Sequence, residues 1–413
     1  MLRKFWLDVL FGTIFIFAVI GLFGSIVAFK VFDVFDPIGD AMADMETTDI
    51  VFSQMRDRPD ADEDVVLVNI GNMPRAGIAE LIRIVNNYNP KVIGLDTFFY
   101  NPRDSIGDLM LRDMLSYVPN LVMASKLHFN EETEELDSIA TSMPAFSKDA
   151  HLGFANLITA AASQDDLKVC RSFTPKQIVN GEEQLALAVQ LAMQFDPEKA
   201  QKFLDRNNEV EYVNYRGNVL DYGATEYGSR YFALDVEQVF NEDFVPELIE
   251  GKLIIFCYLG EYLGDRRATE DKYFTPLNAN YAGKAELDMF GGVIHANIIS
   301  MIMNEDYIDA MSPTMAWFWA VVAGIFNVAL FSLIYKRIPR WYDGTTKLFQ
   351  LLELGVLLFL ILLIFDTYNY KMDLTYALIV IAISGDALEV YYGVVKNTFT
   401  REGRRELFKI NKL

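Results

Sequence analysis

Four apolar stretches stand out along the chain, and each is close to the roughly 20 residues that cross a bilayer core as a helix. They are Leu10–Phe29, Met315–Tyr335, Leu348–Phe365 and Leu374–Val395. A long and mostly polar segment separates the first stretch from the second, and a short basic tail follows the fourth. The pattern predicts four transmembrane helices and one large domain on a single side of the membrane.

These stretches set the domain boundaries that we expect. The predicted parts are a stub with the first transmembrane helix (1–30), an α/β domain (31–311), three transmembrane helices (312–395) and a tail (396–413). The first helix is expected to stay attached to the chain, because its apolar run is longer than the roughly 7–15 residues of a secretory signal.

Within residues 31–311, apolar runs typical of buried strands alternate with amphipathic helices. The runs Val65–Gly71, Lys91–Phe99 and Asn120–Leu127 predict strands that are buried on both faces. Helical periodicity follows Pro74 and recurs over Asp108–Val118. This β-α-β-α-β order predicts an α/β fold with a largely parallel central sheet and right-handed crossovers.

The second half of the domain continues with both kinds of element. We expect a solvated loop at Glu131–Asp137, short strands at 151–158, 168–175 and 211–217, a helix at Glu182–Phe195, a buried strand at Lys252–Gly260 and a helix at Gly291–Ile308. The last helix leads towards the second apolar stretch.

Lysine and arginine are concentrated on one side of the predicted helices. They are Arg3, Lys4, Lys336, Arg337, Arg340 and Lys347, together with six in the tail. The connection Asp366–Asp373, in contrast, carries one lysine and two aspartates. Because basic segments stay in the cytoplasm, we predict that both termini are cytoplasmic and that residues 31–311 are extracytoplasmic.

The net charge of −21 is unevenly distributed. Residues 31–311 hold 48 acidic and 22 basic side chains, whereas the remaining segments hold 9 acidic and 14 basic ones. An acidic domain of this kind is repelled by nucleic acid and by anionic lipid headgroups, so nucleic acid is not an expected partner. The bilayer itself is the expected partner of the four helices.

Three ordered segments resemble the CHASE2 family of extracytoplasmic bacterial sensor domains. They are DEDVVLVNIG followed by KVIGLDTFFYNPRDSIGDLML, then LIIFCYLGEYLGDRRATEDKYFTPLN, and finally MFGGVIHANIISMI. The layout of one span, a domain and three spans is also similar to that family. The resemblance implies a multi-pass protein of the bacterial inner membrane, with its large domain in the periplasm.

The chain departs from that family after its last span. Such proteins usually continue into a cytoplasmic kinase or cyclase, whereas here only the short tail follows. We therefore expect a homodimeric sensor whose output comes from a separate membrane or cytoplasmic partner. The alternatives are a structural scaffold subunit of an envelope complex and, less favoured, a proton-coupled transport subunit.

The ends of two predicted strands carry candidate ligand-binding residues. Asp96 ends the second strand, and further polar groups follow in the loops after that strand and after the late strand: Arg103, Asp104, Asp271 and Thr275. Ligands bind at the carboxyl ends of parallel strands, so these groups would converge on a small polar ligand or a cation if the two strands are neighbours. The alternative interpretation is that Asp96 caps a helix or pairs with an arginine.

The remaining reactive residue types do not form a recognised catalytic set. His295 and Asn297 lie in an apolar helix, where a lone histidine is usually structural. The histidines and the two cysteines lack the spacing of a metal site, and no phosphate-binding loop is present. We therefore expect no enzyme activity, no metal and no cofactor. Cys170 and Cys257 could form one disulfide or remain two buried thiols.

Polar residues inside the predicted spans are the other candidates. They are Asn327, Glu353, Asp386 and Glu389. Ionisable groups within a bilayer are costly and often mark function, here partner binding or coupling. The alternative is that these residues lie near the interface and bond to Tyr391, Tyr392 or Lys347. Residues 401–413 mix basic and apolar side chains and suit a short docking helix.

The topology can be tested with two inserted reactive cysteines, one after Gln201 and one after Leu413. A membrane-impermeant thiol reagent should label the first site in spheroplasts and the second only after the membrane is opened. Labelling of both sites from the same side would contradict the predicted orientation.

Overall fold

The computed structural model describes residues 2–24, 46–56, 60–130, 135–157, 169–219, 230–278 and 286–396. The chain divides into two compact units. Residues 1–43 and 309–413 belong to the first, which we call the helical unit, and residues 44–308 form the second, the sheet unit.

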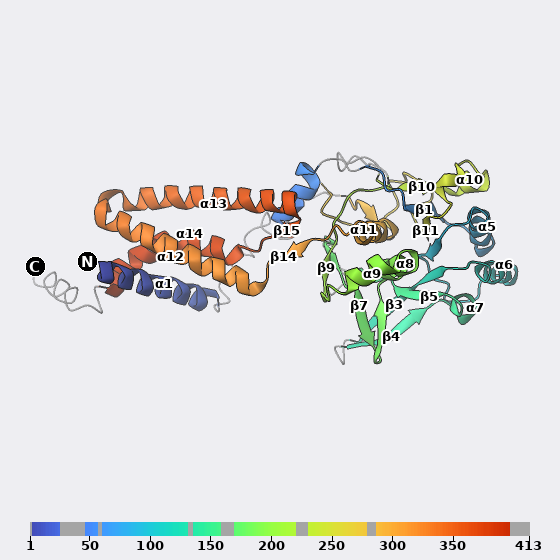
Figure 1. The fold of residues 1–413 in the computed structure, drawn as a ribbon, viewed down its shortest axis with the longest axis horizontal. Coiled ribbons are helices and arrows are strands. Elements are labelled where there is room, and N and C mark those ends of the chain that lie inside the picture. The colour runs from blue at the N-terminus through green and yellow to red at the C-terminus, as the bar shows by residue number, and fades with distance from the viewer. Residues whose placement is uncertain are drawn as a thin grey trace, which may run out of the picture. The chain divides into compact units, whose positions relative to one another are not determined.

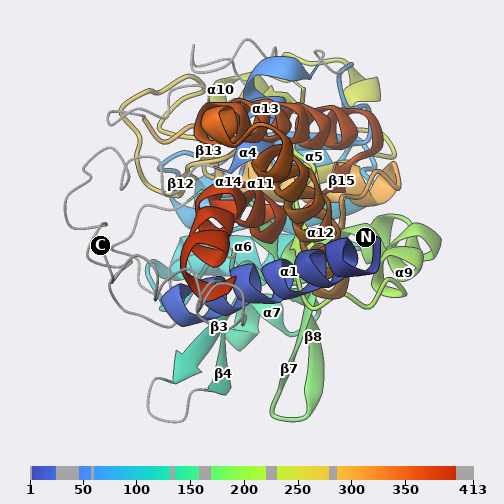
Figure 2. The same cartoon turned by 90° about the vertical axis from the view of Figure 1, so that its left-hand side faces the viewer.

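Four long helices make up the described part of the helical unit. They are α1 (Leu2–Gly24), α12 (Pro313–Arg337), α13 (Tyr342–Tyr368) and α14 (Thr375–Val390), the last continuing as a π-helical turn over Tyr391–Val395. Each has the length and apolar composition needed to cross a membrane, as the sequence predicted. Helix α12 packs against α1 and α14, and α14 packs against α13 (Figures 1 and 2). The predicted end of the first apolar stretch, Phe29, lies outside the described residues.

Close packing and hydrogen bonds hold these helices together. A side chain at Gly12 would meet Val328 at 2.9 Å, so α1 approaches α12 closely, as small residues allow in membrane helices. The side-chain amide of Gln350 donates to the carbonyls of Ile381 and Ala382 at 2.7 and 2.8 Å. Helix α13 is therefore bonded to α14 by side chains as well as by apolar contact.

A seven-stranded, largely parallel sheet forms the centre of the sheet unit. Its strands are β1 (Val65–Asn69), β2 (Val92–Leu95), β3 (Leu121–Asn130), β4 (Glu135–Thr141), β5 (His151–Phe154), β10 (Phe232–Leu234) and β11 (Leu253–Cys257). They follow the order β10-β1-β11-β2-β3-β4, with β5 also paired to β3, and only the β3–β4 pair is antiparallel. The predicted parallel sheet is therefore confirmed.

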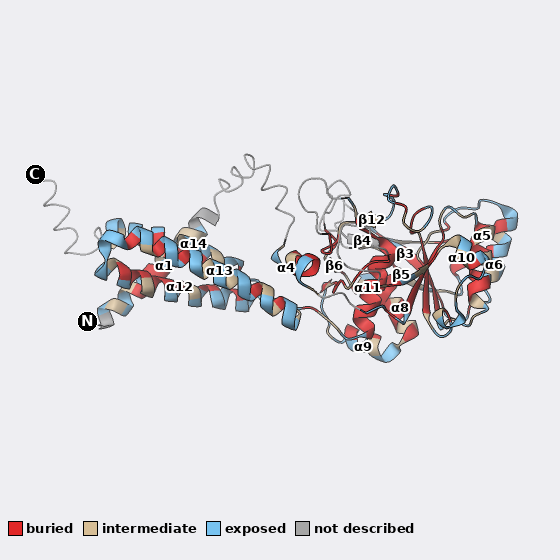
Figure 3. Ribbon diagram, turned by 90° about the horizontal axis from the view of Figure 1, so that it is seen from above, coloured by how far each residue is buried: buried red, intermediate tan, exposed pale blue. Residues whose placement is uncertain are grey.

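Alternating residues of the central strands are buried against helices on opposite faces. Val66, Ile93 and Ile254 belong to a core shared with α5 (Arg75–Asn86), α6 (Ser105–Leu115) and α10 (Val236–Phe240). Helices α8 (Leu187–Phe195) and α11 (Gly291–Met303) cover the other face, and α9 (Pro197–Leu204) packs on both (Figures 1 and 3). Burial on both faces explains why β1 and β11 consist almost entirely of apolar residues.

Short elements complete the sheet unit. They are α4 (Thr47–Ile50), the π-helical turn Val51–Met55, α7 (Pro144–Ser147), the 3-10 turn Pro246–Leu248, and the pairs β6 (Ser172–Phe173) with β9 (Glu211–Tyr212), β7 (Lys176–Val179) with β8 (Glu182–Leu185), and β12 (Lys272–Tyr273) with β13 (Met289–Phe290). The described part of the helical unit has one such pair, β14 (Asp309–Ala310) with β15 (Tyr370–Lys371), and the 3-10 turn Pro339–Trp341.

Three local predictions were wrong. The expected helix Glu182–Phe195 begins only at Leu187, because Asn180 and Gly181 both have positive φ and turn the chain into the β7–β8 hairpin. The helix expected to reach Ile308 ends at Met303, since Glu305 adopts a left-handed φ of 52°. Part of the expected loop Glu131–Asp137 belongs to β4, while its first four residues are outside the described part.

The first turn of α11 lies unusually close to the end of β11. A Cβ atom at Gly292 would lie 2.4 Å from the Cys257 sulfur. Gly292→Val should therefore lower the free energy of unfolding of the sheet unit by about 1–3 kcal/mol, the usual cost of overpacking. Urea unfolding of the detergent-solubilised full chain can be followed by the reactivity of the buried Cys170 thiol.

Gly355→Ala is the matched control, because nothing lies within 4 Å of a Cβ atom at that helical position. An unchanged urea midpoint for Gly292→Val would show that α11 can move away from β11 without loss of stability.

Candidate functional site

The candidate site lies at the carboxyl ends of β1, β11 and β2. Strand β11 pairs in parallel with both β1 and β2, so the end of the Asp96 strand lies beside the end of the late strand. The sequence had left this adjacency as a condition for the ligand site, and the condition is met. The polar groups at these ends divide between the two faces of the sheet.

Asp96 faces α11. Leu95 belongs to the core against α5 and α6, so the next residue projects to the opposite face. The backbone N–H of Asp96 donates to the carbonyl of Phe256 at 2.9 Å, which fixes the residue at the strand end. Its side chain is only 9% exposed, and burial raises the pKa of its carboxyl.

His295, in the second turn of α11, is a basic group that lies close to Asp96. Its Nε2 lies 4.0 Å from Asp96 Oδ2, and its side chain is 3% exposed. Burial lowers the pKa of His295 to about 4, so the imidazole is neutral at neutral pH. Its Nδ1 is buried and has no hydrogen-bond partner among the described residues.

Asp271 brings a second carboxyl to the start of α11. It follows the late strand in a left-handed conformation with φ of 55°, and its backbone carbonyl accepts the Gly291 N–H at 2.9 Å. A Cβ atom at Gly291 would lie 2.9 Å from both carboxylate oxygens, so the carboxylate rests against the helix N-terminus. Solvent reaches this residue, yet the surrounding protein and the charge of Asp96 raise its pKa.

The two carboxyls therefore act as one titrating unit. Burial raises the pKa of Asp96, the charge of Asp96 adds to the raised pKa of Asp271, and neither carboxyl has an arginine or lysine partner among the described hydrogen bonds and ion pairs. Such a pair retains a proton at a pH where isolated carboxyls are ionised. The nearby Cys257 thiol also has a raised pKa, because of burial and both negative charges, and stays protonated. Cys170 and Cys257 are both free and buried, not joined by a disulfide.

Two of the predicted ligand residues have local structural contacts. The Asp104 carboxylate caps α6 by accepting the Ile106 and Gly107 N–H groups at 3.4 and 2.7 Å. Thr275 is buried and donates its hydroxyl to Asp288 at 2.5 Å. Burial raises the pKa of Asp288 to about 7. Both Asp104 and Thr275 are therefore held by contacts within the fold.

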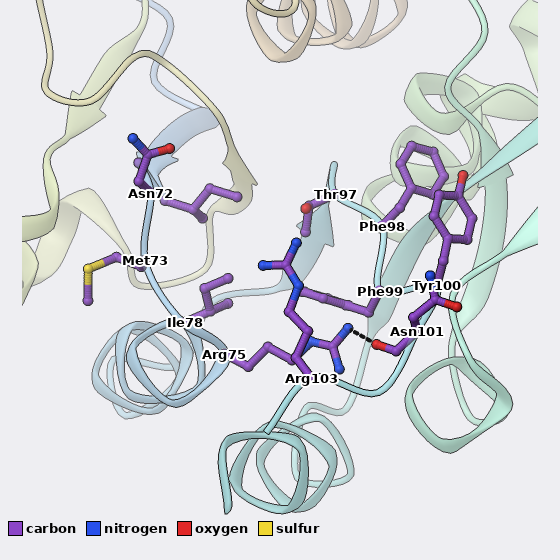
Figure 4. A pocket seen from close by; sticks show the side chains of 12 residues that line it. Asn72, Met73, Arg75, Ile78, Thr97, Phe98, Phe99, Tyr100, Asn101 and Arg103 are labelled. Atoms are coloured by element: carbon purple, nitrogen blue, oxygen red, sulfur yellow. Dashed lines mark hydrogen bonds between the residues drawn. The ribbon is translucent and has the colours of Figure 1, made fainter. Parts of the chain in front are cut away.

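Arg103 lies on the other face of the sheet, at a cavity of about 330 Å³. The cavity is bounded by the residues after β1, the first turn of α5, and the residues after β2. Figure 4 shows the Arg103 guanidinium projecting between Ile78 and Thr97. The structure thus brings Asp96 and Asp271 together, while Arg103 belongs to a separate hollow above α5 and α6.

Arg75 forms the fixed part of this cavity. Its guanidinium bonds to Asp108 and to the carbonyl of Asn101, both at 2.5 Å, and lies over the rings of Phe99 and Phe146. The guanidinium holds the pKa of the Asp108 carboxyl below its usual value. Sequence reasoning missed Arg75 because its partner lies 33 positions away on another helix.

The polar residues of the spans occupy different environments. Asp386 pairs with Lys347 at 2.6 Å, which is the alternative that the sequence left open. Asn327 is buried, contacts Glu353, and donates to the carbonyl of Ala323 at 3.2 Å. Glu389 is exposed on α14. The tail 401–413, predicted to dock a partner, lies outside the described residues.

The carboxyl pair makes the stability of the sheet unit depend on pH in a defined direction. Both folded-state pKa values are raised, so stability should fall as pH rises from about 4, the unfolded value, through the folded values, and stay reduced above them. Asp96→Asn should therefore raise the urea midpoint at pH 8 and change it little at pH 4. The measurement is Cys170 reactivity with dithiodipyridine, which reacts at both pH values.

Asp108→Asn is the control with the opposite sign. Its folded pKa is lowered, so its contribution to stability is present above pH 4, and its replacement should lower the midpoint at pH 8. A lower midpoint for Asp96→Asn at pH 8 would show that the ionised carboxylate stabilises the fold.

Comparison with known proteins identifies the family. The CHASE2 domain model matches residues 29–335, which cover most of the chain and include all the residues at the strand ends. No curated protein and no solved structure matches the chain. The three segments that suggested the resemblance all fall within the matched range. The chain therefore belongs to the CHASE2 family of sensor domains.

Proposed function

We propose that this protein is a sensor in the bacterial inner membrane, with residues 31–311 on the extracytoplasmic side. A stimulus at the strand ends would shift α11, and the helical unit would pass that shift to a separate partner protein. The observation that carries this proposal is the position of α11. Its first turns contact the Asp96–Asp271 pair, and only residues 304–308 separate its end from β14, after which α12 begins.

Side chains fix α11 along its length to the sheet unit. Asn297 accepts the Arg216 N–H at 2.8 Å and donates to the Gly217 carbonyl at 3.0 Å. Near the helix end, Lys199 donates to the Met303 carbonyl at 2.7 Å. A displacement of α11 would therefore also move the segment at Arg216 and Gly217 and the residue Lys199 of α9.

The segment after α11 is also held. Asn214 donates to the carbonyl of Asp306 at 2.9 Å, and the Asp306 carboxylate forms an ion pair with Arg216. Arg216 thus bonds both to the middle of α11 and to the segment that follows it. A change in the helix position therefore alters the start of the link to the first of the three C-terminal spans, which is what a two-state sensor needs.

The stimulus would act through His295 and the carboxyl pair. If the carboxyl pair or His295 takes up a proton, or if a bound ligand displaces the proton of the pair, the charge beside the first turns of α11 changes. Because this region has a low effective dielectric, such a change has a larger electrostatic effect than it would have in water. The buried and unpaired Nδ1 of His295 offers a hydrogen-bonding position that another conformation could fill.

The partner would meet the spans at the cytoplasmic end of α14. Asp386 is exposed although it pairs with Lys347, and Glu389 is exposed one turn further along the helix. An ionised group facing lipid would cost at least about 2.5 kcal/mol on insertion scales. A polar surface on a partner protein removes this cost.

Affinity purification of the full chain from crosslinked membranes tests the proposal. Asp386→Leu combined with Glu389→Leu should reduce partner recovery, the amount of partner protein that co-purifies with the chain, at least several-fold. Membrane insertion of this double variant should stay normal. Asp366→Leu is the control. Asp366 is also an exposed acid, but it lies near the C-terminal end of α13, away from Asp386 and Glu389. His295→Gln should change partner recovery without lowering the stability of the sheet unit.

Two results would contradict the proposal. Unchanged recovery with the double Leu variant would show that these acids do not hold the partner. Recovery that responds to the double variant but never to changes at His295 or Asp96 would favour a structural scaffold over a sensor.

A further inference from the structure

The cavity at Arg103 is not used by the carboxyl pair, which lies on the opposite face of the sheet. It sits at the carboxyl ends of β1 and β2, the edge where parallel sheets bind ligands. Its volume of about 330 Å³ is near the lower end of the range of ligand cavities. A small molecule therefore fits it better than a macromolecular segment.

Among the described residues that line the cavity, Arg103 is the cation whose side chain forms no ion pair. Arg75 is neutralised by Asp108, with which it forms an ion pair at 2.5 Å. The Asp104 carboxylate is engaged by the N-terminal amides of α6, and Asp108 also accepts the backbone N–H of Arg103 at 3.1 Å. The Arg103 side chain itself is exposed and takes part in none of the hydrogen bonds or ion pairs found among the described residues.

Other residues that line the cavity are polar or aromatic. Asn72 and Thr97 supply amide and hydroxyl groups, and Figure 4 shows Thr97 beside the Arg103 guanidinium. The rings of Phe98 and Tyr100 are stacked, with their centroids 5.1 Å apart, and both residues line the cavity. Groups of this kind bind hydroxyl or amide substituents and the faces of small rings or chains.

We propose that this cavity binds a small organic monocarboxylate with polar substituents. The carboxylate pairs with the Arg103 guanidinium, whose planar fork matches two carboxylate oxygens. The polar substituents contact Asn72 and Thr97. That this ligand is the stimulus of the protein depends on the proposed sensory function. Its binding to the cavity does not, and can be measured by itself.

The surroundings favour a single negative charge over two or three. Glu261 accepts a hydrogen bond at 3.2 Å from Asn72, which lines the cavity, and so brings a negative charge close to it. Residues 31–311 hold 48 acidic and 22 basic side chains, so a multiply charged anion meets repulsion that one arginine does not offset. Inorganic phosphate and dicarboxylates are therefore the expected poor ligands.

Binding is tested with the full chain in detergent by isothermal titration calorimetry. The probes are gluconate, glucuronate and lactate as monocarboxylates, glucose as the neutral analogue, and malate and inorganic phosphate as the more highly charged anions. At least one hydroxylated monocarboxylate should bind, and should do so more tightly than glucose, malate and phosphate. Its affinity should fall with added salt, because the ion pair is partly exposed.

Arg103→Ala should weaken this binding at least tenfold, and Arg103→Lys should restore only part of it because an ammonium lacks the planar fork. Arg112→Ala is the matched control: Arg112 is an exposed arginine on α6 that pairs with Asp113 and does not line the cavity. The urea midpoint of Arg103→Ala should equal that of the wild type, which separates lost binding from lost folding.

A second readout locates the ligand. A dicarbonyl reagent specific for arginine should modify Arg103, and the monocarboxylate should protect that residue but not Arg112, as seen by mass spectrometry. The proposal is overturned if no monocarboxylate binds at millimolar concentration, if phosphate binds more tightly, or if Arg103→Ala binds as well as the wild type. Binding at Arg103 without any effect on the amount of partner recovered would show that this ligand is not the stimulus, and would leave both the binding site and the proposed role of the carboxyl pair in place.

Discussion

The close contact between α11 and the end of β11 is the constraint on which the rest of the sheet unit depends. Two consecutive glycines begin the helix, and a Cβ atom at the second would overlap the Cys257 sulfur. Because the helix starts this near the sheet, His295 comes within 4.0 Å of Asp96 and the Asp271 carboxylate rests against the first turn. A helix set further out would leave room for water, and the two carboxyls would then titrate separately.

Desolvation, not a nearby opposite charge, governs the behaviour of this region. Burial is the leading cause of the raised pKa values of Asp96 and Asp288 and of the lowered pKa of His295, whereas at the solvent-accessible Asp271 the surrounding protein and the charge of Asp96 raise the pKa together. Ionisable groups with pKa values shifted in this way tend to cluster at functional sites, where their contribution to function outweighs their cost to stability. The other face of the strand ends is different: among the described residues there, Asp104 and Asp108 are engaged by backbone amides and by Arg75, and the Arg103 side chain forms no ion pair.

Much of the fold follows from the sequence because burial leaves a periodic signature. The runs at β1, β2 and β11 and the four long helices could be recognised in this way, as could the position of Asp96 at a strand end. The β7–β8 hairpin was missed because the apolar periodicity after Leu185 outweighed the turn signal of Asn180 and Gly181. The Arg103 cavity could not be predicted as a shape, since it depends on how α5 and α6 pack around Arg75 and Asp108.

The short β14–β15 pair restricts how motion can enter the membrane helices. Asp309 donates to the carbonyl of Asn369 at 3.0 Å, and Met311 donates to that of Lys371 at 2.9 Å, so the start of α12 is bonded to the connection between α13 and α14. A piston-like slide of α12 alone would break both bonds. The β14–β15 pair links α12 to α13 and α14. These three helices can therefore tilt or rotate together more easily than α12 can slide alone.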